Sequence, residues 1–140
     1  MGELVQLAVA PVFLLVAIGS LLSVVTGRLG RVVDRARTLE DRYFEHPEKC
    51  DKDAVARELK SLDRRMSFCH WSIDFFSIAA LIVALLVAMV FIADTTDPSQ
   101  NFAISALFIT AVGGIVIGIC CFIAEVGIAT RTVHVRPEFR

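Results

Sequence analysis

The sequence TGRLGRVVDRARTLEDRY (residues 26–43) carries two patterns at once, and together they decide the fold. It places five arginines directly after an apolar run that is long enough to cross a bilayer. A few basic residues would be enough to end a membrane span and set its orientation. The apolar residues of the stretch also recur at alternating spacings of four and three, which is the a and d pattern of a coiled coil. The stretch therefore predicts one helix that leaves the membrane and continues as an arm of a helical hairpin.

The second arm of this predicted hairpin follows after a short break. The segment EHPEKCDKD (residues 45–53) contains a proline and several charges, and Asp51 or Asp53 is a candidate N-cap for the next helix. From Val55 onward the same spacing returns and leads without interruption into the next apolar run. We expect the two arms to pair as an antiparallel coiled coil over about residues 28–72. The predicted hairpin seam consists of Leu29, Val32, Ala36, Leu39, Tyr43, Val55, Leu59, Leu62 and Met66.

Three apolar runs predict three membrane spans, at about residues 4–26, 73–93 and 102–124. Each holds roughly 20 residues, the length that crosses about 30 Å of hydrocarbon as a helix. Hydrophobic residues make up 56% of the chain and its mean hydropathy is +0.67, above the level of ordinary soluble domains. The expected fold class is all-α integral membrane, with residues 1–140 as a single membrane domain that ends in a tail at 131–140.

The distribution of lysine and arginine predicts the orientation. Eleven of the fourteen basic residues fall within residues 28–72, and the other three fall in the tail. The N-terminal segment and the loop DTTDPSQN (residues 94–101) have none. By the positive-inside rule, the hairpin and the C-terminus lie in the cytoplasm and the N-terminus lies outside. The formal net charge is −1, which provides no overall attraction for nucleic acid, so we expect no nucleic-acid partner.

Two carboxylates, Asp74 and Glu125, lie close to the predicted inner ends of the spans. A carboxylate at this depth needs a cationic partner, because an unpaired buried charge is costly. Arg28 and Arg31 end the first span at a matching depth, so we expect these four residues to form a charge network. Its role is either a structural salt bridge between the spans or an ion-responsive site at the inner end of a conduction path.

The chain lacks the residue patterns of enzymes and cofactor sites. It has no recognisable nucleophile–base pair and no phosphate-binding loop. His46 and Cys50 are four residues apart, but Pro47 falls between them and no second pair completes a zinc site. We therefore expect no enzyme activity, no cofactor and no metal.

Small residues recur at helix-packing spacing in the second and third spans. Such stripes let helix backbones approach closely in a membrane, where hydrophobic attraction between helices is absent. Three short spans bury little surface by themselves, so we expect the chain to associate with copies of itself. The predicted packing residues are Ala80, Ala84, Ala88, Ala111, Gly114 and Gly118.

The first span carries a further stripe of residues beside the hairpin seam. In a ring of copies this stripe would line a narrow pore with an acidic outer mouth, Phe13 as a hydrophobic gate and Arg31 as a basic ring at the inner exit. The alternative is that its small residues mark a helix-packing face. The pore-lining candidates are Glu3, Gln6, Ala10, Phe13, Ala17, Ser20, Val24, Gly27 and Arg31.

The stretch PVFLLVAIGSLLSVVTGRLGRVVDRARTLE (residues 11–40) resembles an uncharacterised family of small bacterial inner-membrane proteins. In that family the first span ends in an R-x-x-R-[IV]-[VI]-D-R-x-R pattern. The likeness extends over most of the chain, including three spans of which the last two are close together. The resemblance implies a bacterial inner-membrane location and no agreed activity. The residues that carry it are Arg28, Arg31, Val32, Val33, Asp34, Arg35 and Arg37.

The topology is also similar to that of the Oxa1/YidC-like membrane insertases, which carry a cytoplasmic hairpin between their first two spans. That likeness is one of fold only. Those proteins have a polar groove within the bilayer, whereas the arginines of this chain begin at the interface. Three hypotheses for function remain: a homo-oligomeric ion-conducting pore lined by the first span, a scaffold or accessory subunit that docks another membrane or cytoplasmic protein through its hairpin, and an insertase or chaperone.

Overall fold

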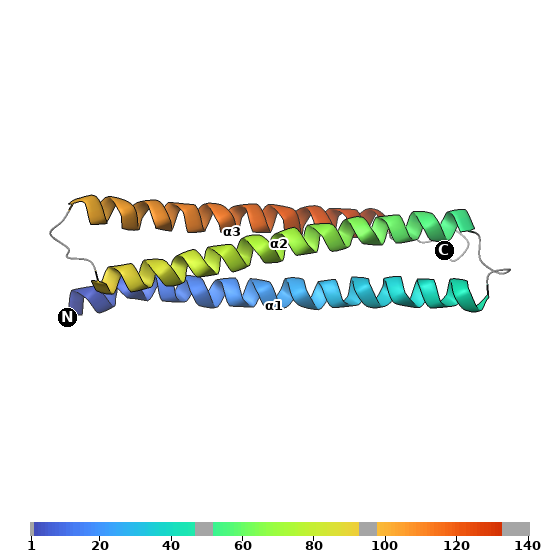
Figure 1. The fold of residues 1–140 in the computed structure, drawn as a ribbon, viewed down its shortest axis with the longest axis horizontal. Coiled ribbons are helices and arrows are strands. Elements are labelled where there is room, and N and C mark those ends of the chain that lie inside the picture. The colour runs from blue at the N-terminus through green and yellow to red at the C-terminus, as the bar shows by residue number, and fades with distance from the viewer. Residues whose placement is uncertain (1, 47–51, 93–97, 133–140) are drawn as a thin grey trace.

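The computed structural model consists of three long α-helices and describes residues 2–46, 52–92 and 98–132 (Figure 1). Helix α1 comprises Gly2–Glu45, α2 comprises Lys52–Ile92 and α3 comprises Pro98–Thr132. All three are long and apolar enough to cross a membrane. The prediction of an all-helical chain with three apolar helices is therefore confirmed, and the composition is that of a membrane protein.

Helices α1 and α2 each extend well past their apolar runs. In α1 the helix continues through the arginine-rich stretch without a break, and the one proline within it, Pro11, lies in the first apolar part. A proline is tolerated inside a membrane helix because neighbouring helices compensate for the lost hydrogen bond. At the start of α2, Asp53 places a negative charge in the first turn, where it interacts favourably with the helix dipole. Both arms of the hairpin are thus helical.

The central helix of the bundle is α2, whose two main contacts are with α1 and with α3. Figure 1 shows α1 and α2 running antiparallel, and α2 and α3 doing the same. It also shows that α1 and α2 extend past the end of α3. We call this end of the molecule, where residues 46–51 join α1 to α2, the hairpin end. The extension leaves a two-helix hairpin beyond a three-helix bundle.

The contact between α1 and α2 has two apolar clusters. Within the bundle, Ile18 and Val25 of α1 pack in one cluster with Cys69 and Phe76 of α2. Towards the hairpin end a second cluster forms around Val32, with members from both arms of the predicted seam. That second cluster consists of Val32, Ala36 and Leu62, packed against Leu39, Leu59 and Met66. Six of the nine predicted seam residues therefore meet in this cluster and Leu29 packs against the first cluster, while the supercoiling of a coiled coil stays a prediction.

The contact between α2 and α3 depends on small residues of α3. Ala111 is buried, and a Cβ atom added to Gly114 would lie 3.4 Å from the Cβ of Ala79. A Cβ added to Gly118 would lie only 2.7 Å from a ring carbon of Phe76, so a larger residue there would force the ring to move. Glycine at this position lets the Phe76 ring lie directly on the backbone of α3, which is the close approach that membrane helices use.

Large apolar side chains cover the outside of the bundle. Phe13 of α1, Leu81 of α2 and Ile109 of α3 are each more than half exposed. A continuous outer surface of this kind is unusual on a soluble monomer and suits a hydrocarbon environment. The core formed by the described residues is small, because three helices in this arrangement enclose little volume.

Candidate functional site

The carboxylate of Glu125 lies between two arginines at the junction of the three helices. Its side chain, on α3, is 0% exposed. Arg65 of α2 donates to Oε1 from both Nε, at 3.0 Å, and Nη2, at 2.9 Å. Arg28 of α1 donates from Nη1 to Oε2 at 3.1 Å. Both carboxylate oxygens are thus bonded, and one buried side chain connects α1, α2 and α3.

The burial of Glu125 makes its two partners necessary. A carboxylate removed from water is stable as an anion only where cations and hydrogen-bond donors replace the lost hydration. Both arginine side chains remain partly exposed, so each keeps some contact with its surroundings. The Arg28 guanidinium also lies 5.4 Å from the centre of the Phe122 ring, a cation–π distance. We call Arg28, Arg65 and Glu125 the ion-pair triad.

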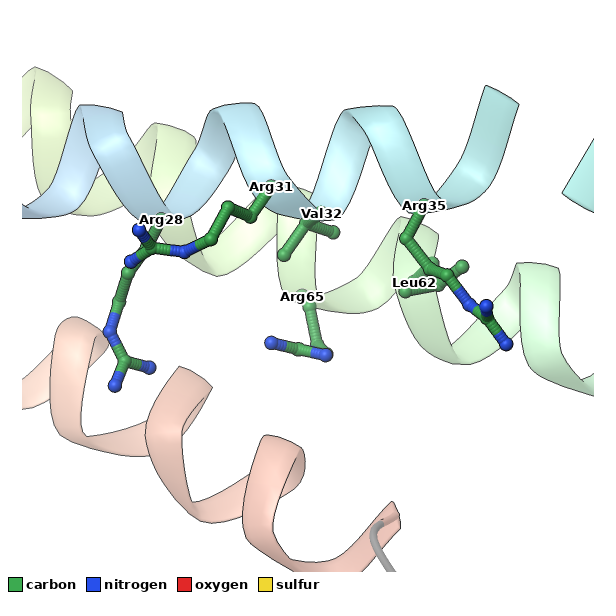
Figure 2. A pocket seen from close by; sticks show the side chains of 6 residues that line it. All are labelled: Arg28, Arg31, Val32, Arg35, Leu62 and Arg65. Carbon is green, nitrogen blue, oxygen red and sulfur yellow. The ribbon is translucent and has the colours of Figure 1, made fainter. Parts of the chain in front are cut away.

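Beside the triad lies a pocket between α1 and α2 that is lined mainly by arginine. Its volume is about 330 Å³. Figure 2 shows Arg28 and Arg65 extending towards α3, Arg31 lying along α1, and Arg35 reaching past Leu62. We call it the arginine pocket; its lining residues are Arg28, Arg31, Val32, Arg35, Leu62 and Arg65.

The farther end of the arginine pocket carries an exposed ion pair. Arg35 donates from Nε, at 3.1 Å, and from Nη2, at 2.9 Å, to Oε1 of Glu58 on α2. Both side chains are well exposed. Arg31, in contrast, has no ion pair among the residues that the structure describes, and its side chain is exposed. The other three guanidinium groups of the pocket each pair with a glutamate.

The four residues of the expected charge network lie in different surroundings. Glu125 and Arg28 are in direct contact. Arg31 lies on the wall of the arginine pocket instead. Asp74 is exposed on α2 and has no ion pair within the described ranges 2–46, 52–92 and 98–132.

Arg65 is the member of the triad that the sequence reasoning missed. Its contact with Glu125 can be predicted from the antiparallel register of α2 and α3. Phe76 packs on Gly118, and the hydroxyl of Ser72 donates to the Gly118 carbonyl at 3.0 Å. Seven residues, or about two helical turns, separate Gly118 from Glu125 on α3, and the same number separates Ser72 from Arg65 on α2. Any register that places Ser72 at Gly118 therefore brings Arg65 to Glu125.

The pore-lining candidates lie along the outside of α1. The side chains of Glu3 and Gln6 lie outside the part of the chain that the structure describes. The remaining candidates are all exposed, and the Ser20 hydroxyl donates to the backbone carbonyl of Val16 in its own helix. We call these exposed candidates the α1 stripe: Ala10, Phe13, Ala17, Ser20, Val24, Gly27 and Arg31.

The small residues of the second and third spans separate into two groups. Those of α3 face α2, as described above for Gly114 and Gly118. On α2, Ala80 is half-buried at the edge of the core, whereas Ala84 and Ala88 are exposed. The α2 residues that pack inward are offset from that alanine row: Phe76, Ala79, Val83, Leu86 and Val90.

No cluster of three or more potential metal ligands occurs among the described residues. Cys50, one half of the pair considered with His46, lies outside them, as does the tail from residue 133 onward. Three features remain as candidates for function: the buried ion-pair triad, the guanidinium of Arg31, which has no ion pair among the described residues, and the exposed α1 stripe.

Residues 8–135 match the model of a protein family described as a protein of unknown function, DUF2721. The match covers most of the chain, which therefore belongs to this family. A search of curated proteins and a search of solved structures each gave no match.

Proposed function

We propose that this member of the DUF2721 family is a non-enzymatic membrane protein that assembles from several copies, with its α1 helices lining a narrow ion-conducting path. In this proposal the protein resides in a bacterial inner membrane, with the N-terminus outside and the hairpin and C-terminus in the cytoplasm. The observation that carries the proposal is the α1 stripe, whose residues are exposed from Ala10 to Arg31.

The composition of the α1 stripe supports close contact between copies. Ala10, Ala17 and Gly27 let neighbouring helices approach to short distances, as small residues do in membranes. Phe13, which is 70% exposed, would form a constriction of the kind that gates by excluding water. Just after the apolar run of α1, Arg31 would form a basic ring at the inner exit. A path of this kind conducts only when the constriction is wetted.

Ion flux in reconstituted liposomes tests the pore. Replacing the aromatic ring by a methyl group in Phe13→Ala widens the constriction, so we expect a severalfold rise in flux over the unmodified protein. Phe102→Ala is the matched control, because Phe102 is an exposed phenylalanine of α3 outside the stripe. Equal flux for all three proteins, or no flux from any of them, would rule out conduction through α1.

A second candidate function is that of a scaffold, and one observation favours it. At the tip of the hairpin, beyond the end of α3, Phe44 is 80% exposed and lies in edge-to-face contact with Tyr43. An exposed phenylalanine supported by a half-buried tyrosine on a projecting helix suits contact with another protein. Phe44→Ala should abolish crosslinking from the hairpin to a partner in native membranes, whereas recovery of crosslinks between copies alone would contradict this role.

The insertase hypothesis requires a polar groove at the depth of the spans. The described core there is apolar and includes Ile18, Phe76 and Val83. Polar side chains gather instead at the arginine pocket near the hairpin end. Crosslinks to nascent membrane proteins, rather than between copies, would favour this third function over the pore.

A further inference from the structure

The arginine pocket combines a cavity with an excess of positive charge. Four guanidinium groups line it. Two carboxylates, Glu125 and Glu58, pair with three of these groups. The balance is two positive charges, and Arg31 supplies the one guanidinium without an ion pair among the described residues. The pocket is thus built to attract a group with one or two negative charges.

The geometry of guanidinium groups indicates which kinds of anion suit the pocket. Arginine presents planar, forked donors that match the oxygens of phosphate and carboxylate. The pocket volume of about 330 Å³ is at the small end of the range for small-molecule sites. Arg31 of α1 and Arg65 of α2 both line the pocket, so its donors come from different helices (Figure 2). A tetrahedral group between them would meet donors from both α1 and α2.

The position of the pocket along the helices also favours an anion of this kind as its ligand. The apolar run of α1 ends at Thr26 and that of α2 begins at Ile73. The four arginines lie directly beyond these limits, on the hairpin side. In a bilayer this is the level of the lipid phosphates, where basic residues bind anionic headgroups. The exposed apolar side chains described above lie on the part of the helices that would be in the bilayer, next to this level.

We propose that the arginine pocket is a binding site for a phosphoryl group, with Arg31 as the residue that contacts it. The group belongs either to the headgroup of an anionic phospholipid or to a soluble phosphate. The proposal does not rest on conduction or on assembly of copies, since the pocket lies within one chain. Phosphoryl binding fails or succeeds independently of any flux measurement.

The test is binding to the full-length protein purified in detergent and stripped of lipid. One arm adds phosphatidylglycerol or phosphatidylcholine and counts bound lipids by native mass spectrometry. The other arm titrates inorganic phosphate by calorimetry. Selective binding of phosphatidylglycerol assigns the site to a headgroup, and binding of inorganic phosphate assigns it to a soluble anion. If neither probe binds, the proposal is wrong.

Two variants and a matched control locate the site. Arg31→Gln removes the open guanidinium and should weaken binding at least about tenfold, since charge-assisted hydrogen bonds are among the strongest. Arg37→Gln makes the same change on an exposed position of α1 outside the pocket and should change affinity less than about twofold. Equal losses in the two variants would show diffuse attraction to a basic helix and overturn the proposal.

The second variant changes affinity in the opposite direction. Glu58→Gln removes the carboxylate that pairs with Arg35 and so raises the net charge of the pocket by one. Tighter binding of the same probe is expected, and it cannot arise from misfolding. Unchanged or weaker binding in a variant with unaltered helical circular dichroism would contradict an electrostatic site at this place.

Discussion

The central helix α2 makes two contacts of different chemistry, one with each neighbour. Against α1, outside the apolar runs, it uses aliphatic side chains around Leu62, with charged residues such as Glu58 outside. Against α3 it uses close approach at Gly118, a hydroxyl bond from Ser72 and the buried carboxylate of Glu125. The first contact is of the kind that forms in water, and the second is of the kind that forms in lipid.

This difference is the one expected if the α2–α3 contact lies in the bilayer and the hairpin lies in water. In water, apolar area removed from the surface stabilises a contact and surface charges contribute little. In hydrocarbon there is no such gain, so helices associate through close packing and polar bonds. One helix therefore carries two sequence patterns in succession, and each pattern can be tested separately.

The largest expected effect comes from depriving Glu125 of its main partner. Arg65→Met removes two of the three hydrogen bonds to a carboxylate that has no contact with solvent. We expect a loss of about 3–5 kcal/mol in the free energy of unfolding, because the charge stays buried without compensation. Unfolding by titration with SDS in mixed micelles measures it.

The double variant Arg65→Met with Glu125→Leu controls for lost side-chain volume. Replacing both partners by apolar residues should recover part of the loss, since no buried charge remains unpaired. An additive loss in the double variant would mean that the ion pair does not determine stability at this junction.

The next largest effect is expected in the aliphatic contact. Leu62→Ala removes a buried side chain between α1 and α2, for which losses of about 2–5 kcal/mol are typical. Leu81→Ala on the same helix changes an outward-facing leucine and should have little effect. Similar losses at both positions, in the same SDS titration, would contradict a hairpin held together by its seam.

A smaller effect is expected at the close contact of α2 and α3. Gly118→Ala adds a methyl group at 2.7 Å from the Phe76 ring, which must shift at a cost of about 1–3 kcal/mol. Gly113→Ala adds the same group where, apart from its chain neighbours and the adjacent backbone of its own helix, no atom lies within 4 Å. The losses in the two variants can be compared directly because both glycines lie on α3. If Gly113→Ala destabilises as much as Gly118→Ala, the loss does not come from the Phe76 contact.

The smallest effect is expected at the exposed ion pair. Arg35→Met removes the partner of Glu58 where both side chains reach solvent, so the loss should stay below about 1 kcal/mol. Raising the salt concentration should reduce it further. A loss as large as that of Arg65→Met would mean that burial does not distinguish the two ion pairs.

The sequence predicts the helices better than it predicts the charge contacts. The three apolar runs and the four-three spacing follow from local periodicity, which is readable without the fold. The partner of Glu125 depends on the register between α2 and α3, which local patterns do not specify. Arg65 was therefore missed, although the spacing from Ser72 leads to it once Gly118 is known to lie opposite. The exposure of Ala84, likewise, depends on how α2 is rotated in the bundle.

The most direct test of the central claim is the number of copies in particles of the full-length protein extracted into lipid nanodiscs, measured by native mass spectrometry. We expect a ring of several copies that Ala17→Trp disrupts, because Ala17 lies in the exposed α1 stripe. Ala84→Trp, at an exposed alanine of α2, should leave the ring intact. A single copy in the unmodified protein, or a ring that only Ala84→Trp disrupts, would contradict assembly through α1.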